Sequence, residues 1–133
     1  MPSRPRQATE IRCAWTLALL ALTLWLVGAR ADEPGAGEAV LKKCEICHSL
    51  DSNGRTKVGP NLHGLFGRKA GTAPGFAFSD AMKKSGIVWD NDTLAAFLRD
   101  PKASVPGNRM SFPGIKDDAA LADLLARLRQ ATQ

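Results

Sequence analysis

The sequence lacks several patterns that would point to common fold and function classes. No stretch alternates apolar and polar residues as a half-buried β-strand does, and no internal repeat or low-complexity tract appears. The chain has no tyrosine and only two histidines, His48 and His63. A structural zinc site would need a fourth ligand besides a cysteine pair and His48, and His63 matches zinc-finger spacing poorly. These absences favour an all-α fold and argue against structural zinc.

A basic surface for nucleic acid is also missing, although the formal net charge is +5. The 133 residues carry 18 basic and 13 acidic side chains. Residues 1–31 hold four of the basic side chains and one acidic one, so the remainder has 14 minus 12, or +2. No basic stripe interleaved with aromatic residues follows. The composition therefore indicates no nucleic-acid partner, and the length fits one domain.

Residues 1–31 have the pattern of a secretory signal peptide. Three arginines precede an apolar stretch over residues 13–29, and Ala29-Arg30-Ala31 provides a small-residue cleavage pattern. We therefore expect cleavage before Asp32 and a mature domain over residues 32–133. The alternative is an uncleaved membrane anchor formed by residues 13–29. Either outcome places the domain outside the cytoplasm, in the periplasm or tethered to the outer face of the inner membrane.

The most informative stretch is Cys44-Glu45-Ile46-Cys47-His48, which has the C-x-x-C-H pattern of c-type haem attachment. Two thiols three positions apart on one helical turn can each add to a vinyl group of one porphyrin. The histidine that follows is then held beneath the iron, where its imidazole can serve as an axial ligand. The motif therefore predicts one haem c, attached through Cys44 and Cys47, with His48 on the iron.

Two other interpretations of the motif remain open at this point. A redox-active C-x-x-C usually begins a helix that follows a strand, and no strand-like run precedes Cys44. Chance occurrence is the second, because the motif defines only three residues. The rest of the chain has to decide between these interpretations and haem.

Four segments are expected to be helical, namely residues 36–46, 78–84, 90–99 and 117–131. The first carries the motif on an amphipathic helix, and the last has a stripe of leucines. Gly37 is a poor helix former, and we expect it to let another helix approach closely. Glycine and proline are dense in residues 49–75 and 101–114. These two segments are expected to be loops, the first wrapped around a large ligand.

A six-coordinate iron needs a second axial ligand, and the candidates are Met110, His63 and Met82. Met110 lies in a loop stiffened by proline, so little entropy is lost when the loop holds a weak thioether ligand in place. His63 lies in a tight glycine-rich turn, where its expected role is to hydrogen-bond the loop backbone. Met82 has Lys83 and Lys84 beside it and is expected to pack in or at the edge of the core. Met110 is therefore ranked first.

Further motifs follow the C-x-x-C-H in a characteristic order. They are Gly59-Pro60-Asn61-Leu62-His63-Gly64-Leu65-Phe66-Gly67-Arg68, Pro74-Gly75-Phe76, Gly86-Ile87-Val88-Trp89, Thr93-Leu94 and Pro106-Gly107-Asn108-Arg109-Met110-Ser111-Phe112, before the leucine-rich final segment. With this set, residues 35–132 resemble a class I cytochrome c of the mitochondrial and bacterial c2 types. The resemblance makes covalent haem the favoured interpretation of the motif.

The resemblance implies a small all-α fold in which the N- and C-terminal helices cross and loops wrap a covalent haem. His48 and Met110 would be the axial ligands. The other positions that would contact the cofactor or its ligands are Pro60, Arg68, Trp89 and Asn108. The Pro60 carbonyl would accept a hydrogen bond from the His48 ring. Arg68 and the Trp89 indole would lie near the haem propionates, where they offset buried negative charge.

The implied function is that of a monomeric one-electron carrier and not of an enzyme. Its partners would be a bc1-type donor and, as acceptor, a terminal oxidase, a reaction centre or another redox protein. Docking would use basic residues around the exposed haem edge, namely Lys43, Lys57, Lys102, Arg109 and Lys116. A merely solvated mixed surface is the alternative, because the mature net charge is small. The rival class is an enzyme or sensor whose methionine side opens to a small molecule.

Three positions depart from the family pattern. Phe78 and Phe97 occupy places where tyrosines are common, and Met82 one where asparagine is common. Apolar groups thus replace hydroxyl and amide donors near the haem. We expect a drier pocket with a weaker internal hydrogen-bond network.

Overall fold

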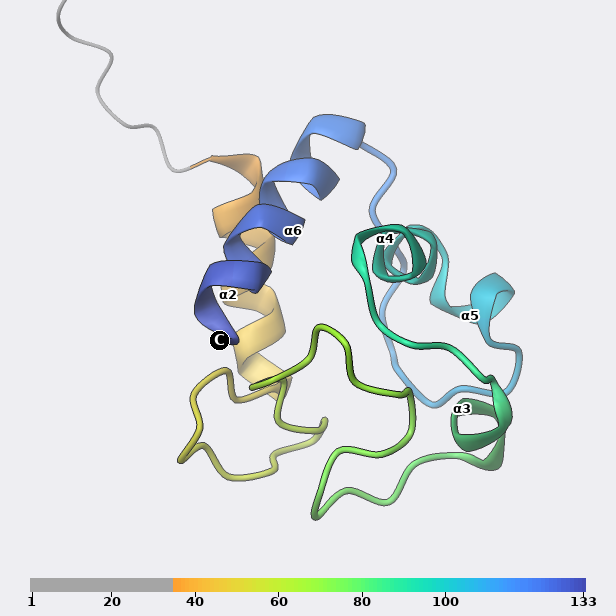
Figure 1. The fold of residues 1–133 in the computed structure, drawn as a ribbon. Helices are drawn as coiled ribbons and strands as arrows, with labels where there is room; N and C mark the ends of the chain where they lie inside the picture. The colour runs from red at the N-terminus through yellow and green to blue at the C-terminus, as the bar shows by residue number, and fades with distance from the viewer. Residues whose placement is uncertain (1–34) are drawn as a thin grey trace, which may run out of the picture. The chain divides into compact units, whose positions relative to one another are not determined.

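The computed structural model describes residues 35–133, and five helices lie within this range (Figure 1). They are α2 (Ala36–Cys47), α3 (Asp80–Lys84), α4 (Asn91–Arg99), α5 (Pro101–Ser104) and α6 (Asp118–Ala131). The same range contains no strand, only an isolated antiparallel bridge between Lys69 and Val88. The predicted all-α fold is confirmed. The predicted signal peptide or anchor lies outside the described residues.

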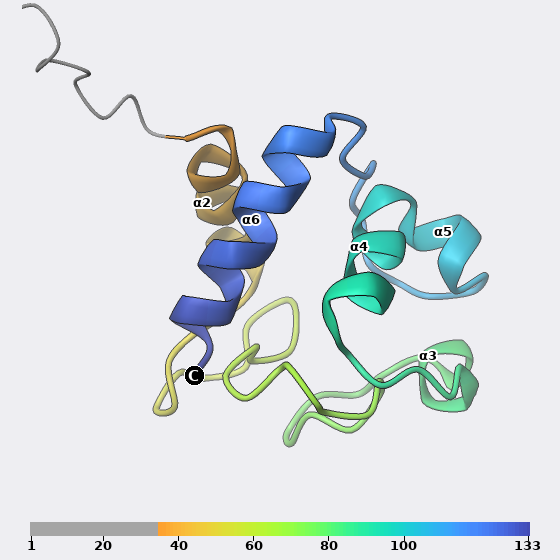
Figure 2. The ribbon, with the colours of Figure 1, turned by 45° about the horizontal axis from the view of Figure 1, so that its top comes forward.

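Helices α2 and α6 come from the two ends of the described chain and cross each other (Figures 1 and 2). Gly37 is buried at this crossing, and a Cβ atom built on it would lie 2.6 Å from the backbone carbonyl carbon of Asp123. The missing side chain therefore lets the two backbones approach closely, as predicted. Leu124 lies at the same place and is 0% exposed.

Helix α4 begins where its sequence predicts, with Asp90 as the N-cap. The Asp90 carboxylate accepts a hydrogen bond from the backbone N–H of Thr93 at 2.7 Å, and the Thr93 hydroxyl accepts one from the backbone N–H of Asp90 at 2.9 Å. This reciprocal pair satisfies two backbone donors that the first turn leaves free. Leu94, Phe97 and Leu98 form the buried face of the helix.

Helix α5 corrects the sequence prediction, which placed residues 101–114 in one loop. Residues Pro101–Ser104 form a short helix, with Asp100 accepting from the backbone N–H of Ala103 at 3.0 Å. Proline is compatible with the first helical position because the N–H it lacks would have no intrahelical partner there. Asp100 and Pro101 therefore begin a helix, which was missed in the sequence because the prolines of this segment indicated a loop.

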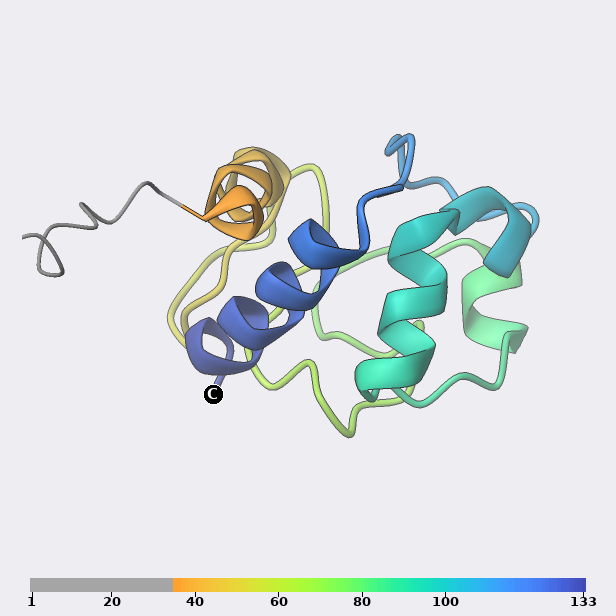
Figure 3. The same cartoon turned by 90° about the horizontal axis from the view of Figure 1, so that it is seen from above.

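Helices α2 and α6 lie on one side of the molecule and α3, α4 and α5 on the other (Figure 3). The chain between α2 and α3 forms no helix and runs as a series of turns, which in the view of Figure 1 lie below α4 and at the lower ends of α2 and α6. Leu50, Leu65, Ala70 and Ala73 from these turns are buried. No helix within residues 35–133 is long and apolar enough to cross a membrane.

Candidate haem-binding site

A cavity of about 580 Å³ is lined by residues of α2, α3, α4 and α6 and of the loops that precede α3 and α6. Its volume is in the usual range for small-molecule and cofactor sites. Most of the predicted site residues line it, namely Cys44, Cys47, His48, Pro60, Arg68, Trp89 and Met110. Asn108 does not line it. The fold therefore brings together side chains from four separate parts of the sequence.

The two thiols occupy the last turn of α2, which extends to Cys47. Cys44 and Cys47 are both partly buried, and neither forms a disulfide within the described residues 35–133. Burial raises the pKa of the Cys44 thiol. A redox-active C-x-x-C needs a lowered thiol pKa, so this environment argues against the redox interpretation. Thiols spaced along one turn at a cavity wall suit covalent attachment to a large ligand.

His48 follows α2 directly, and its ring is oriented by the neighbouring loop. Its Nδ1 lies 2.7 Å from the carbonyl oxygen of Pro60. A carbonyl only accepts hydrogen bonds, so Nδ1 carries the proton and Nε2 keeps its lone pair. Burial lowers the pKa of His48, which also favours the neutral ring. A neutral imidazole with a free Nε2 is the form that binds a metal.

Gly59 makes room for this arrangement. A Cβ atom built on Gly59 would lie 2.7 Å from Nδ1 of His48, closer than real Cβ atoms approach other heavy atoms. The backbone N–H of Gly59 also donates to the carbonyl oxygen of Cys47 at 2.8 Å, which ties the loop to the end of α2. Residue 59 therefore has to be glycine for the His48 ring to reach Pro60.

Aromatic and aliphatic side chains supply most of the remaining wall. Trp89 and Phe97 are buried side by side with ring centroids 5.1 Å apart, and Phe76 and Phe78 meet edge to face at 4.8 Å. Met82 is buried and lines the cavity, in agreement with its predicted packing role. Such a lining excludes water and lowers the local polarity around a bound group.

Several buried leucines pack against the cavity, and the sequence did not distinguish them from leucines that pack against other side chains. Leu94 and Leu98 of the predicted helix over residues 90–99 and Leu128 of the leucine stripe were not predicted as site residues, yet all three line the cavity. Helical periodicity identifies a buried face but not what covers it. Val58 was missed as well, because nothing in its local sequence marks it.

Arg68 is part of the cavity wall and also organises the loop. Its two terminal nitrogens donate to the carbonyl oxygens of His63 at 2.8 Å and Asn61 at 3.0 Å. Burial lowers the pKa of this guanidinium. A partly buried cation at the cavity wall can offset a carboxylate of a bound group, since an unpaired buried charge is costly.

The expectation for the His63 side chain was wrong. Its Nδ1 is buried without a hydrogen-bond partner in the described part of the chain, and the loop contacts come from its backbone instead. His63 is also absent from the cavity lining, whereas Met110 is present. Of the three candidate second ligands, only the two methionines line the cavity.

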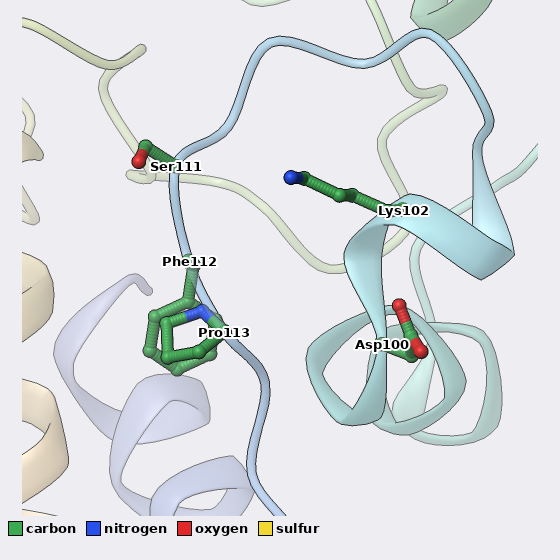
Figure 4. Close-up of a pocket in the computed structure, with 5 residues that line it drawn as sticks. All are labelled: Asp100, Lys102, Ser111, Phe112 and Pro113. Atoms are coloured by element: carbon green, nitrogen blue, oxygen red, sulfur yellow. The ribbon is translucent and has the colours of Figure 1, made fainter.

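A second, smaller hollow of about 300 Å³ lies at the surface between α5 and the chain that leads to α6 (Figure 4). It is lined by Asp100, Lys102, Ser111, Phe112 and Pro113. Ser111 and Phe112 line both this hollow and the large cavity. Lys102 points across the hollow toward the segment that carries these two residues. The hollow holds no cysteine or histidine and is no alternative to the large cavity.

An all-α fold around an apolar cavity, in which two thiols and an imidazole of one C-x-x-C-H motif share the wall, defines a c-type haem protein. The chain is 46% identical over 112 residues to cytochrome c2 of Blastochloris viridis, covering 84% of this chain and 88% of that one. The chain is also 46% identical over 114 residues to cytochrome c2 of Rhodomicrobium vannielii, covering 85% of this chain and 90% of that one. It is 46% identical over 98 residues to cytochrome c of Sesamum indicum, covering 73% of this chain and 88% of that one. The chain belongs to the class I cytochrome c family. No protein-family model matches it.

The cofactor of the protein is therefore haem c, and the residues present fit it. Cys44 and Cys47 offer two thiols on one helical turn, and His48 offers a correctly protonated imidazole beside them. The cavity is large and mostly apolar, with Arg68 as a positive group in its wall. The motif and its surroundings thus agree on covalent haem.

Proposed function

We propose that this cytochrome c is a one-electron carrier in which His48 and Met110 are the two axial ligands of the haem iron. The observation that carries the proposal is that an imidazole with a free Nε2 and a thioether line the same largely apolar cavity. Imidazole and thioether together are a ligand pair of electron-transfer cytochromes. The relatives named cytochrome c and cytochrome c2 support the electron-carrier part of this proposal.

When bound, haem supplies an iron that takes up and releases a single electron. The chain's part is to keep both ligands in place through that change. The hydrogen bond to Pro60 holds the His48 ring in one orientation. Trp89, Phe97 and their aliphatic neighbours exclude water and favour the less charged ferrous state. The protein would therefore work at the high-potential end of a respiratory or photosynthetic chain.

Docking to redox partners would occur where basic residues border the cavity. Lys43 and Arg109 line it. Nζ of Lys57 donates to the carbonyl oxygens of Glu45 at 2.8 Å and His48 at 3.3 Å, so its charge is held beside the haem motif. Complementary charge mainly raises the association rate of short-lived complexes. These three cations support the proposed role of a basic docking surface.

The other two predicted docking residues do not line the cavity. Lys102 borders the smaller hollow, and Nζ of Lys116 donates to the carbonyl oxygen of Arg99 at 3.1 Å. Ile46 lies within the C-x-x-C-H motif and is 74% exposed, and Val58 lines the cavity and is 81% exposed. The proposed docking surface therefore has exposed aliphatic side chains among its cations. We expect its partners to be a bc1-type donor and an oxidase, a reaction centre or another redox acceptor.

The proposed location is the periplasm. Residues 1–31 carry the signal-peptide pattern described above, with residues 13–29 as its apolar stretch. We propose that the mature cytochrome domain spans residues 32–133 and acts as a monomer. Mass spectrometry of the exported protein would show a mass that begins at Asp32 and includes haem. A mass that includes residues 1–31 would instead support the membrane-tethered alternative.

The visible spectrum of the ferric protein tests the proposed ligation. Coordination of a thioether to ferric haem gives a weak charge-transfer band at the red end of the spectrum. We expect this band in the wild-type protein, with slow binding of added cyanide, and loss of the band in Met110→Ala. A matched Met82→Ala variant should keep it. A wild-type protein without the band that binds cyanide at once would contradict the carrier and favour an open-site enzyme or sensor.

A further inference from the structure

Asn108 lies two residues before Met110 but outside the cavity lining. Its side-chain amide makes three hydrogen bonds within the chain. Nδ2 donates to the carbonyl oxygens of Pro101 at 2.6 Å and Val105 at 2.9 Å, and Oδ1 accepts from the backbone N–H of Met110 at 2.8 Å. Both amide protons are thus used, and the acceptor is directed at the proposed ligand's own backbone.

Besides the Asn108 amide, two further hydrogen bonds hold the segment that carries Met110. The backbone N–H of Asn108 donates to the carbonyl oxygen of Val105 at 3.0 Å, and the Arg109 guanidinium donates to the carbonyl oxygen of Ala77. No helix lies between the end of α5 at Ser104 and the start of α6 at Asp118. A thioether is a weak iron ligand, so its occupancy depends on how firmly the chain holds it. The Asn108 amide links Met110 to α5 and to the residue that ends it, Val105. The short helix α5 is therefore the anchor of the methionine loop.

The same arrangement occurs a second time, on the histidine side. Nδ2 of Asn61 donates to the carbonyl oxygens of Asp51 at 2.9 Å and Gly54 at 2.7 Å, and its Oδ1 accepts from the backbone N–H of His63 at 2.8 Å. Asn61 directly follows Pro60, the acceptor for the His48 ring. In both loops an asparagine binds two carbonyls and the N–H two residues later. The repetition offers a matched comparison within one molecule.

We propose that Asn108 is a positioning residue that holds Met110 on the haem iron by hydrogen-bonding its backbone to α5. The proposal replaces the expected direct contact of Asn108 with the cofactor, and it rests on the proposed ligation by Met110. Loss of the amide would let the loop open and the thioether leave the iron more often. The opening rate of the sixth position is therefore the quantity that Asn108 controls.

Stopped-flow binding of cyanide to the ferric protein measures that rate. We expect Asn108→Ala to bind cyanide about ten- to a hundredfold faster than wild type, because it removes the three side-chain hydrogen bonds that hold the loop to α5. Asn108→Ser keeps an oxygen that can accept from the Met110 N–H and should fall between the two. The charge-transfer band should weaken in the same order.

Asn61→Ala is the control for general loosening, because it removes the same three kinds of bond from the histidine side. It should lower the denaturant midpoint comparably without a comparable gain in cyanide rate. Asn53→Ala, at an exposed position, controls for loss of an asparagine as such. A wild-type cyanide rate in Asn108→Ala, or an equal acceleration in Asn61→Ala, overturns the role of Asn108 alone. A wild-type protein without the band overturns the proposed ligation and this role together.

Discussion

At the scale of single residues, the geometry of the site is set by the residues that surround His48 and line the cavity. The His48 ring takes its tautomer from the Pro60 carbonyl and its space from the absent side chain of Gly59. Arg68 places a positive charge in the wall while its nitrogens bind two backbone carbonyls. Gly59, Pro60 and Arg68 all lie within residues 59–68, so this second motif is informative beside the C-x-x-C-H that ends at His48.

Phe97 allows the expected dryness of the pocket to be tested. It is 5% exposed, packs against Trp89 and lines the cavity. Phe97→Tyr would add a hydroxyl dipole beside the haem, which stabilises the more charged ferric state. We expect a lower midpoint potential in a redox titration. Phe66→Tyr, outside the cavity lining, is the control, and an unchanged potential in Phe97→Tyr would contradict this account.

At the scale of elements, the N-terminal end of α2 is capped by a side chain of α6 and not by the residue that precedes α2. Gly35 precedes α2 and provides no side chain for a cap. The Asp123 carboxylate of α6 accepts instead from the backbone N–H of Gly37 at 3.0 Å. Nε of Arg127 donates to both oxygens of Asp123, and Nη1 of Arg127 pairs with Glu38 at 3.2 Å. The helix that carries the haem motif is therefore completed only when the last helix is in place.

Removal of this cap should have a measurable cost. We expect Asp123→Ala to reduce the free energy of unfolding by about 1 kcal/mol, the usual value for a lost N-cap. Asp123→Asn keeps an acceptor for the Gly37 N–H and weakens only the partly exposed ion pair with Arg127, which contributes less. Denaturant unfolding of the haem-loaded protein measures both. Equal losses in the two variants would show that the ion pair matters and the cap does not.

At the scale of the whole molecule, the surface around the cavity mouth carries the proposed docking function. Lys43, Lys57 and Arg109 concentrate positive charge there although the net charge beyond residue 31 is small. Local charge near the electron's exit point acts on a partner more strongly than net charge does, because distant charges are screened.

Two small oxidants of opposite charge test this surface without a protein partner. Oxidation of the ferrous protein by an anionic iron cyanide complex should slow as ionic strength rises from about 0.01 to about 0.15 M, where the screening length falls from about 30 to about 8 Å. Oxidation by a cationic cobalt phenanthroline complex should not slow. Stopped-flow absorption measures both rates. Flat profiles for both oxidants would indicate a merely solvated mixed surface.

Local sequence alone determined the features that depend on neighbours in the chain. The C-x-x-C-H motif specified the haem attachment because its thiols and imidazole share one turn and the residue after it. Helices were predicted over residues 90–99 and, from the leucine stripe, over residues 117–131, and the structure contains both. Short-range spacing and capping chemistry are written in consecutive residues, so these predictions needed no tertiary information.

Tertiary structure decided what depends on residues far apart in the sequence. It placed Leu94 and Leu128 on the cavity wall and left Nδ1 of His63 without a hydrogen-bond partner among residues 35–133. It showed Asn108 bonded to α5 and outside the cavity lining. It also supplied the α2 cap from Asp123. Periodicity reveals that a side chain is buried or polar, but the partner that it meets is chosen only when distant segments pack together.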